Sequence, residues 1–167
     1  ICLTNMKAAI IGYGKMGHEI EAVLAERGHE VVKIIDMDNA AEISAEGLAG
    51  VDVAIEFTTP DTAFSNICGA LRAGVAVVSG TTGWTDKMEE VKELCRATDG
   101  TFFYSSNYSL GVNILFKISK ILGAIMKPHS DYTVRIEETH HIQKKDAPSG
   151  TAKTLADDLK EVLYDGD

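Results

Sequence analysis

Five short apolar runs alternate with helix-length amphipathic segments between Lys7 and Tyr104, and this alternation most constrains the fold. The strand candidates span residues 7–11, 31–36, 51–57, 75–79 and 101–104. They lack polar alternation, as is typical of parallel strands that are covered on both faces. The helix candidates between them span residues 15–27, 61–73 and 85–97. The pattern predicts an α/β fold, with a Rossmann-like doubly wound parallel sheet.

Residues that favour helix ends flank these helix candidates. Gly28 and Gly74 follow the first two helices, at the position where a C-terminal glycine cap belongs. Asp61 and Thr85 are the expected N-terminal caps of the second and third helices. The capping residues therefore agree with the helix boundaries that the hydrophobic periodicity indicates.

The rhythm changes after Tyr104. The pattern of residues 110–126 predicts a long helix with four isoleucines on one stripe. Polar and apolar residues alternate over residues 132–139, as in a strand. The pattern of residues 150–163 predicts a last helix, capped by Ser149 or Thr151. We place a dinucleotide-binding domain at residues 6–107 and part of a second, α+β substrate domain at residues 108–167. One strand cannot form a sheet, so we expect this second domain to be incomplete here or completed by a partner chain.

Charge and composition exclude several classes of partner. The chain has 167 residues, with 16 Lys and Arg against 25 Asp and Glu, and its formal net charge is −9. We therefore expect no nucleic-acid partner and no membrane partner. No uninterrupted apolar run is long enough for a membrane span, and no signal peptide is visible. The three cysteines form no CxxC pair, which favours a reducing, cytoplasmic compartment.

The stretch Gly12-Tyr13-Gly14-Lys15-Met16-Gly17 fits the GxGxxG pattern between a strand and a helix. The first glycine permits the turn, the second lets a pyrophosphate approach the backbone, and the third allows close helix packing. Asp36 ends the second strand 19 residues later, where an acid binds the ribose of a dinucleotide. We expect NAD or NADP as cofactor, with NADH slightly favoured because Asp36 repels a 2′-phosphate. Lys15 partly offsets that repulsion, and the alternatives are a plain connecting turn and a solvated strand-end carboxylate.

Two later turns also follow predicted strands, at the edge where such sheets bind ligands. Gly80, Thr81 and Thr82 follow the fourth strand. Ser105, Ser106, Asn107 and Tyr108 follow the fifth. Backbone amides and short polar side chains suit a nicotinamide and its ribose, so we include both turns among the candidate cofactor-binding residues. Taken alone, each is equally consistent with an ordinary loop.

A cationic stretch near residue 140 can meet an anionic substrate. His140, His141 and Lys144 precede Ser149, Gly150 and Thr151, whose amides and hydroxyls form an anion site at the start of a helix. A small dicarboxylate fits this combination. A zinc site that includes Glu138 lacks a third well-spaced ligand, so we expect no metal. The remaining alternatives are a structural histidine and a solvated lysine pair.

The stretch His140-His141-x-x-Lys144-x-Asp146-Ala147-Pro148-Ser149-Gly150-Thr151-Ala152 closely resembles the signature of the 4-hydroxy-tetrahydrodipicolinate reductase (dihydrodipicolinate reductase) family. Residues 12–17, 80–83 and 105–113 match the same family in the same order, so the resemblance extends from Met6 to about Leu163. Family members are normally longer: they complete a mixed sheet in the second domain and return to the nucleotide domain at the C-terminus.

The resemblance implies NAD(P)H-dependent reduction of a cyclic unsaturated dicarboxylate, formed from 4-hydroxy-tetrahydrodipicolinate by loss of water, on the diaminopimelate route to lysine. It implies that His140 is the general acid or base and Lys144 is the proton donor or its electrostatic partner. His141, Lys144, Gly150 and Thr151 would bind the substrate carboxylates, in agreement with the anion site that includes Ser149. A homotetramer is also implied. Another Rossmann-type dehydrogenase and a nucleotide-binding sensor without chemistry remain the alternatives.

Overall fold

The computed structural model describes residues 5–140, 142 and 147–164. Contacts along the chain divide it into two compact units, with the division between Ser105 and Ser106. His141 and Lys144, two of the residues expected to bind substrate, lie outside the described residues. The two units are described separately below.

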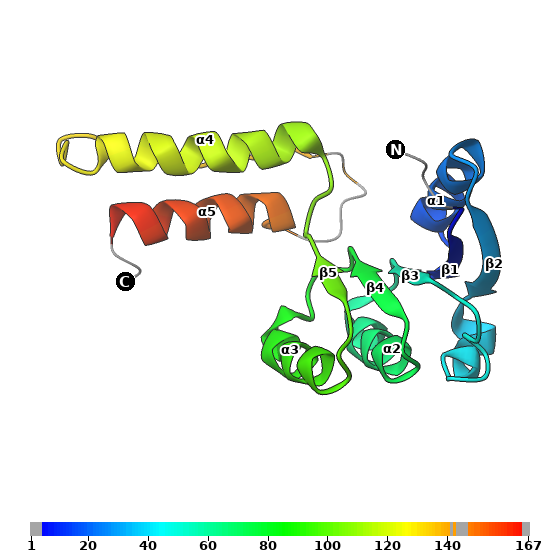
Figure 1. Cartoon of the computed structure of the whole chain (residues 1–167). Helices are drawn as coiled ribbons and strands as arrows, with labels where there is room; N and C mark the ends of the chain where they lie inside the picture. Colours follow the sequence, from blue (N-terminus) through cyan, green and yellow to red (C-terminus); the bar gives the residue numbers. More distant parts are fainter. Residues whose placement is uncertain (1–4, 141, 143–146, 165–167) are drawn as a thin grey trace. The chain divides into compact units, whose positions relative to one another are not determined.

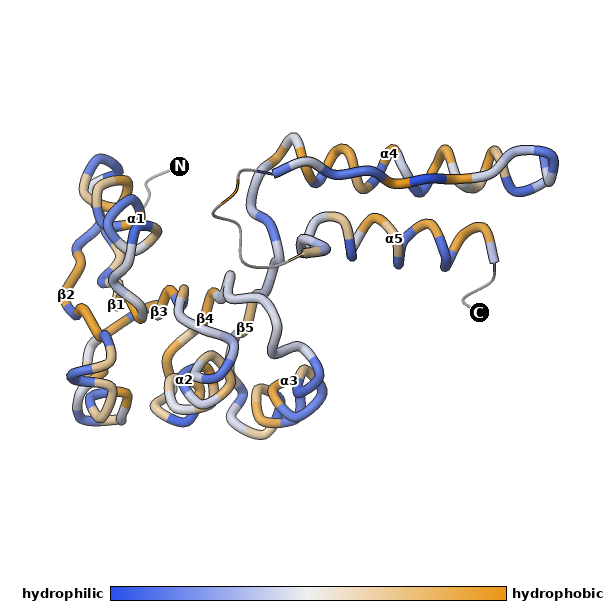
Figure 2. The backbone as a smooth tube through the Cα atoms, turned by 180° about the vertical axis from the view of Figure 1, so that it is seen from behind, coloured by the Kyte–Doolittle hydropathy of each residue, from blue (hydrophilic) through white to orange (hydrophobic). Residues whose placement is uncertain are grey.

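The first unit is built on a five-stranded sheet, as the alternation of strand and helix segments predicts (Figure 1). Its strands are β1 (Lys7–Ile11), β2 (Glu30–Ile35), β3 (Val53–Glu56), β4 (Ala76–Ser79) and β5 (Phe102–Tyr104). Their order in the sheet is β2-β1-β3-β4-β5, and every neighbouring pair is parallel. The hydropathy colouring of Figure 2 shows mostly hydrophobic residues along these strands. The predicted α/β class and parallel sheet are therefore confirmed.

Helices cover both faces of this sheet. The helix α1 (Lys15–Glu26) lies on one face, while α2 (Pro60–Arg72) and α3 (Met88–Ala97) lie on the other (Figure 1). Two short 3₁₀ segments, η1 (Met37–Glu42) and η2 (Thr85–Lys87), follow β2 and precede α3. The sheet is thus doubly wound, with one helical layer on each side.

The expected caps of the second and third helices are wrong. Thr59 is the N-cap of α2, and Pro60 takes the first helical position, where its missing N–H costs no hydrogen bond. Asp61 therefore lies inside the first turn, where its charge favours the helix dipole. Thr85 begins η2 rather than α3, so the predicted third helix is divided in two. The predicted glycine caps are confirmed, since Gly28 and Gly74 follow their helices with φ of 76° and 78°.

The core alternates along β1, because successive side chains of a strand point to opposite faces. Ala8 and Ile10 pack with Leu24 of α1. Ala9 and Ile11 join the larger cluster that includes residues of α2 and α3. The strand β1 is thus buried on both sides.

The second unit contains two packed helices, α4 (Leu110–Met126) and α5 (Gly150–Leu163), both with the bounds that the sequence predicts. Gly123 of α4 lets the helices approach, because a Cβ there would lie 3.3 Å from Leu159 and 3.5 Å from Val162. Lys120 connects them through ion pairs of 3.0 Å to Asp158 and 3.1 Å to Glu161, and hydrogen bonds to these carboxylates raise its pKa.

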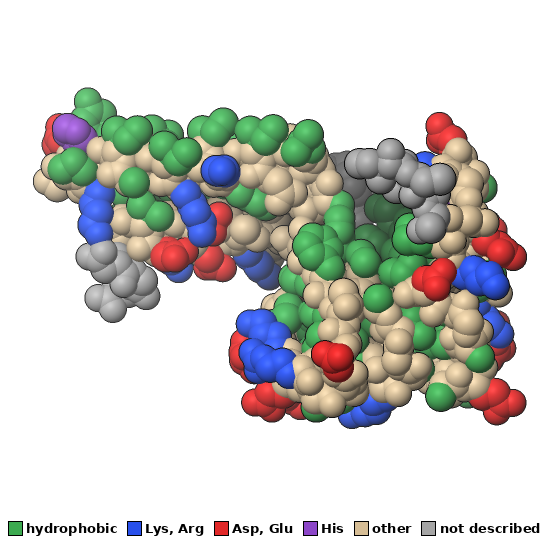
Figure 3. Space-filling view, viewed as in Figure 1, with side chains coloured by type: hydrophobic (Ala, Val, Ile, Leu, Met, Phe, Trp, Pro, Cys, Tyr) green, Lys and Arg blue, Asp and Glu red, His purple; other side chains and the backbone are tan. Residues whose placement is uncertain are grey.

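The predicted strand at residues 132–139 is wrong. The segment is not assigned to a strand, and Val134 and Ile136 are exposed although the alternation predicts that one face is covered. The physical reason is that a strand needs a hydrogen-bonded neighbour, and the described part of this unit offers none. The isoleucine stripe of α4 is also exposed, and hydrophobic side chains line the helix in Figure 3.

Among the described residues, no helix combines the length and apolar character needed to cross a membrane.

Candidate functional site

The carboxyl ends of β1 and β3 border two cavities of the first unit. The chain passes from β1 to β2 on one side and returns to β3 on the other, so the strand order reverses between β1 and β3. Open α/β sheets bind ligands in the crevice at such a reversal. The first cavity measures about 290 Å³ and the second about 350 Å³, and Gly14, Phe57 and Thr58 line both. Because the two cavities share these three residues, they form one candidate site along this edge of the sheet.

The three glycines of residues 12–17 differ in what holds them in place. Gly12 has φ of +95°, and a Cβ there would lie 2.1 Å from the carbonyl oxygen of Phe57. A Cβ on Gly17 would lie 2.5 Å from the carbonyl oxygen of Gly12, so the turn and the helix need both glycines to pack. A Cβ on Gly14 would meet nothing within 4 Å, although Gly14 lines both cavities. Packing within the protein therefore explains Gly12 and Gly17 but not Gly14.

The first turn of α1 is suited to an anion. Gly14 is the N-cap and offers no side chain to the helix amides, and no acidic residue occupies that described turn. Unsatisfied amides and the helix dipole favour a phosphate at this point. Lys15 and Met16 line the second cavity beside this helix end.

Tyr13, by contrast, is engaged with α1. Its hydroxyl donates a hydrogen bond to the carboxylate of Glu21, and this bond raises the pKa of Tyr13. Its ring lies 4.0 Å from the ring of His18, centroid to centroid. Tyr13 lines the first cavity, where it supplies an aromatic wall rather than a titrating group.

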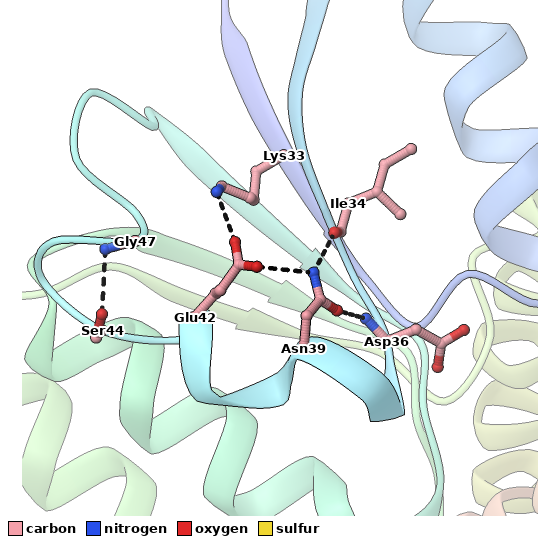
Figure 4. A network of polar contacts seen from close by, with 7 residues as sticks. All are labelled: Lys33, Ile34, Asp36, Asn39, Glu42, Ser44 and Gly47. Atoms are coloured by element: carbon pink, nitrogen blue, oxygen red, sulfur yellow. Dashed lines mark hydrogen bonds and ion pairs between the residues drawn. The ribbon is translucent and has the colours of Figure 1, made fainter.

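Asp36 lines the first cavity at the end of β2, and a polar network fixes its main chain (Figure 4). The amide of Asp36 donates to Asn39 Oδ1 at 2.8 Å, and its carboxylate accepts from the amide of Met37 at 2.9 Å. Asn39 Nδ2 donates to the carbonyl of Ile34 at 3.0 Å and to Glu42 at 3.3 Å. The network therefore fixes the position of the acid next to the cavity.

Lys33 completes this network. Its Nζ lies 2.6 Å from Glu42 Oε2, and the hydrogen bond from Lys33 lowers the pKa of Glu42. Lys33 is thereby directed to Glu42 rather than to the cavity, whose lining does not include it. Asp36 is the charged residue that lines the first cavity at the end of β2.

The second cavity brings the glycine turn together with Gly80, Thr81 and Thr82. A Cβ on Gly80 would lie 2.2 Å from the Phe57 ring, so this turn packs tightly against the end of β3. Sequence reasoning missed the residues that follow β3. The lining of the two cavities also includes Met37, Ala40, Ile43, Phe57, Thr58, Thr59, Pro60, Thr62 and Asn66. Phe57, Thr58 and Thr59 directly follow β3, so the reasoning applied to residues 80–82 and 105–108 could have found them, whereas Thr62 and Asn66 lie in α2 and carry no such signal.

The turn after β5 is divided between the two units, with Ser105 in the first. Ser105 donates its amide to the carbonyl of Ser79 at 3.3 Å, and so continues the sheet edge. Asn107 belongs to the second unit, where its side-chain amide lies 3.5 Å from Thr151 Oγ1. Its Oδ1 accepts from the amide of Ser109 at 2.8 Å. Ser106 and Tyr108 fall in this second unit as well.

Glu138 joins the two ends of the cationic stretch in the second unit. Its carboxylate accepts from the amide of Ser149 at 2.9 Å and from the Ser149 hydroxyl at 2.5 Å. His140 Nε2 lies 2.8 Å from Glu138 Oε2. The hydrogen bonds from the Ser149 hydroxyl, then from His140 and the Ser149 amide, lower the pKa of Glu138 to about 2. The carboxylate is thus an acceptor that orients the imidazole.

The same Ser149 caps α5. Its Oγ accepts from the amide of Ala152 at 3.1 Å, so the cap expected at Ser149 or Thr151 is Ser149. Gly150 and Thr151 occupy the first turn of the helix, where amides favour an anion. The described residues therefore bring His140 and the Ser149–Thr151 turn together through one glutamate, which sequence reasoning considered only as a metal ligand.

Known proteins resemble this chain over nearly its whole length. A family model described as dihydrodipicolinate reductase, N-terminus, matches residues 6–108, and the model for the C-terminus of the same family matches residues 111–165. A 4-hydroxy-tetrahydrodipicolinate reductase from Christiangramia forsetii is 44% identical over 93% of this chain and 64% of its own length. A protein of the same name from Methanoregula boonei is 36% identical over 89% of this chain and 62% of its own length.

Solved structures are similar to this chain as well. A dihydrodipicolinate reductase from Paenisporosarcina sp. TG-14, solved with dipicolinate bound, is 28% identical with a TM-score of 0.75, over 96% of this chain and 67% of that one. An NAD-binding protein from Listeria innocua, 18% identical with a TM-score of 0.53, shares the fold over 76% of this chain and 41% of its own. The chain spans less than two thirds of the length of the two curated relatives described above. On the two family models together, the chain belongs to the dihydrodipicolinate reductase family.

Proposed function

We propose that the chain binds NAD or NADP along the two cavities of the first unit. The observation that carries this proposal is Gly14, a glycine that packing does not require and whose missing Cβ leaves both cavities open. The pyrophosphate lies at the N-terminus of α1, and the adenosine side lies by Asp36. Residues 80–82 border the second cavity, which we assign to the nicotinamide side.

The proposed preference for NADH over NADPH rests on Asp36. Its carboxylate lines the first cavity, and Lys33, the nearby cation on β2, is paired with Glu42. A 2′-phosphate would meet the negative charge of Asp36, whereas ribose hydroxyls can donate hydrogen bonds to it. Lys15 lies by the second cavity, and its positive charge makes the preference shallow.

The proposed reaction is the reduction of a cyclic unsaturated dicarboxylate formed from 4-hydroxy-tetrahydrodipicolinate, on the diaminopimelate route to lysine. This proposal rests on membership of the family and on the cluster that holds His140 beside the anion site at α5. The bound cofactor supplies hydride. Reduction leaves an electron-rich ring carbon that needs a proton, so an acid must lie near it.

The chain's own residues supply the proton and the substrate contacts. His140, oriented by Glu138, is the general acid or base, and Lys144 is the proton donor or its electrostatic partner. The amides of Gly150 and Thr151 receive a substrate carboxylate at the start of α5, while the Ser149 hydroxyl, which donates to Glu138, holds this turn in place. His141 and Lys144 contribute positive charge to the second carboxylate. We propose that these roles apply in a form of the protein with both units and the family's full length.

We further propose a homotetramer in the cytoplasm. The exposed stripe formed by Ile114, Ile118, Ile121 and Ile125 is an apolar face that water does not favour, and a partner subunit or further chain would cover it. Cys68 and Cys95 are free thiols, as suits a reducing compartment.

Replacement of Lys144 by alanine in a full-length form tests the catalytic proposal. We expect turnover to fall by orders of magnitude, measured by NADH absorbance, while the dissociation constant for NADH stays unchanged. The control is Lys145→Ala, which removes one positive charge from the adjacent position. Equal losses from both variants, or parallel loss of NADH binding, would contradict the assignment. NADH binding without turnover of any cyclic dicarboxylate by the unmodified protein would favour a nucleotide sensor.

A further inference from the structure

A buried carboxylate lies at the edge of the sheet between the two turns of the second cavity. Glu56, the last residue of β3, is 0% exposed. Its Oε1 accepts from the Thr58 amide at 3.0 Å, the Thr58 hydroxyl at 2.5 Å and the Thr81 hydroxyl at 2.7 Å. Its Oε2 accepts from the Ser79 hydroxyl at 2.5 Å. Four donors from two neighbouring strand ends thus converge on one side chain.

Burying this carboxylate opposes folding unless its hydrogen bonds compensate. Within residues 5–140, 142 and 147–164, no Lys, Arg or His forms an ion pair with Glu56; its partners are an amide and three hydroxyls. An apolar residue would fill the same space without this cost. The position therefore calls for an explanation beyond packing, and the partners of Glu56 indicate one.

Two of its partners, Thr58 and Thr81, line the second cavity. The amide of Thr58 also donates to Thr81 Oγ1 at 2.8 Å, so the two turns are joined directly as well as through Glu56. Thr58 Oγ1 in turn accepts from Thr62 at 3.1 Å. The carbonyl of Thr81 accepts from Trp84 Nε1 at 2.7 Å, and the Trp84 side chain is buried. Thr62 thus holds the turn after β3, Trp84 holds the turn after β4, and Glu56 joins the two turns.

We propose that Glu56 is a positioning residue for the cofactor site: its carboxylate holds the turn after β3 and the turn after β4 at the separation that dinucleotide binding needs. This inference deepens the proposed function and rests on it. Glu56 itself lines neither cavity, so any effect on binding must pass through Thr58 and Thr81. The hydroxyl protons of both threonines are committed to the carboxylate, which fixes their rotamers against the cavity wall.

The test compares NADH dissociation constants, measured by fluorescence titration, for the full chain and two Glu56 variants. Glu56→Gln keeps the shape but replaces one of the two acceptor oxygens by an NH₂ donor, so we expect affinity to fall on the order of threefold to tenfold. Glu56→Leu removes the acceptor of the Thr58, Ser79 and Thr81 hydroxyls, and we expect a loss larger still. Val91→Ala is the control, because Val91 is a buried residue of α3 that takes no part in the hydrogen bonds of Glu56.

Thermal denaturation of the same proteins separates positioning from stability. We expect Val91→Ala to lower the melting temperature at least as much as Glu56→Gln while it keeps the NADH affinity of the parent. Unchanged affinity in Glu56→Gln would overturn the proposal, as would an equal loss of affinity in Val91→Ala.

If the Glu56 variants do not fold, Ser79→Ala serves in their place. It removes the bond to Oε2, and Ser79 lines neither cavity. We expect a loss of about threefold, and parent-like affinity would overturn the proposal. If the unmodified chain binds no dinucleotide, the proposed function itself fails, which is a different result from any of these.

Discussion

Alanine at Gly14 should separate ligand binding from folding. A Cβ at this position meets no protein atom within 4 Å, so the folded unit can accept it without a clash. Gly14 has φ of −84° and ψ of −157°, a conformation that alanine adopts readily. The added methyl would instead project into the cavities that Gly14 lines.

Two small and opposing terms set the expected change in stability. Alanine is a poorer N-cap than glycine by about 1 kcal/mol, and it reduces the entropy of the unfolded chain by an amount worth about 0.4–1 kcal/mol. The net change in unfolding free energy is therefore within about 1 kcal/mol. A pyrophosphate that must approach the backbone at Gly14 loses that approach, so we expect the dissociation constant for NADH to rise by roughly tenfold to a hundredfold.

Denaturant unfolding and NADH titration of the same samples make the comparison. The matched control is Gly12→Ala, which places a Cβ 2.1 Å from the carbonyl of Phe57 at a φ of +95°. Strain and overpacking there should cost about 3–5 kcal/mol. The reasoning is refuted if Gly14→Ala binds NADH like the parent, or if it destabilises the chain as severely as Gly12→Ala.

Three further predictions concern charged groups. Asp36→Asn should lower the ratio of the NADPH dissociation constant to the NADH dissociation constant. An unchanged ratio would show that Asp36 does not select the cofactor. The pKa of Glu138 is lowered from 4.5 to about 2, so its bonds stabilise the second unit above pH 4.5 and that stabilisation is lost as the pH falls toward 2. Acid unfolding of Glu138→Gln should lack this component; an identical acid profile would contradict it. Lys120→Met should cost under about 1 kcal/mol in denaturant unfolding, less in high salt, and a salt-independent loss would argue against ion pairing.

The sequence predicted most elements because their signals are local. β1 and both helices of the second unit have the expected bounds, since apolar periodicity and capping residues are set by near neighbours. The predicted caps of α2 and α3 were wrong. In α2 the N-cap is Thr59, which precedes Pro60, and α3 is preceded by a 3₁₀ turn. The strand expected at residues 132–139 failed for a non-local reason, because alternation describes a strand's faces but does not supply its neighbour.

The candidate site was predictable in part for the same reason. Gly14, Asp36 and Thr81 lie at the cavities because a motif or a strand end marks them. Thr58 follows a strand end and was missed although the same signal was applied elsewhere, Asn66 carries no signal, and Glu56 looks like any strand residue until its four donors are seen. Their roles depend on which strands are neighbours, and that order emerges only when the sheet is assembled.

Amide hydrogen exchange of the full chain, with and without NADH, tests the central claim most directly. The account predicts slower exchange on NADH addition at residues 12–17 and 80–82, together with residues 57–59, while the amides of α3 are unaffected. Binding of NADH with no protection at these turns would contradict the account.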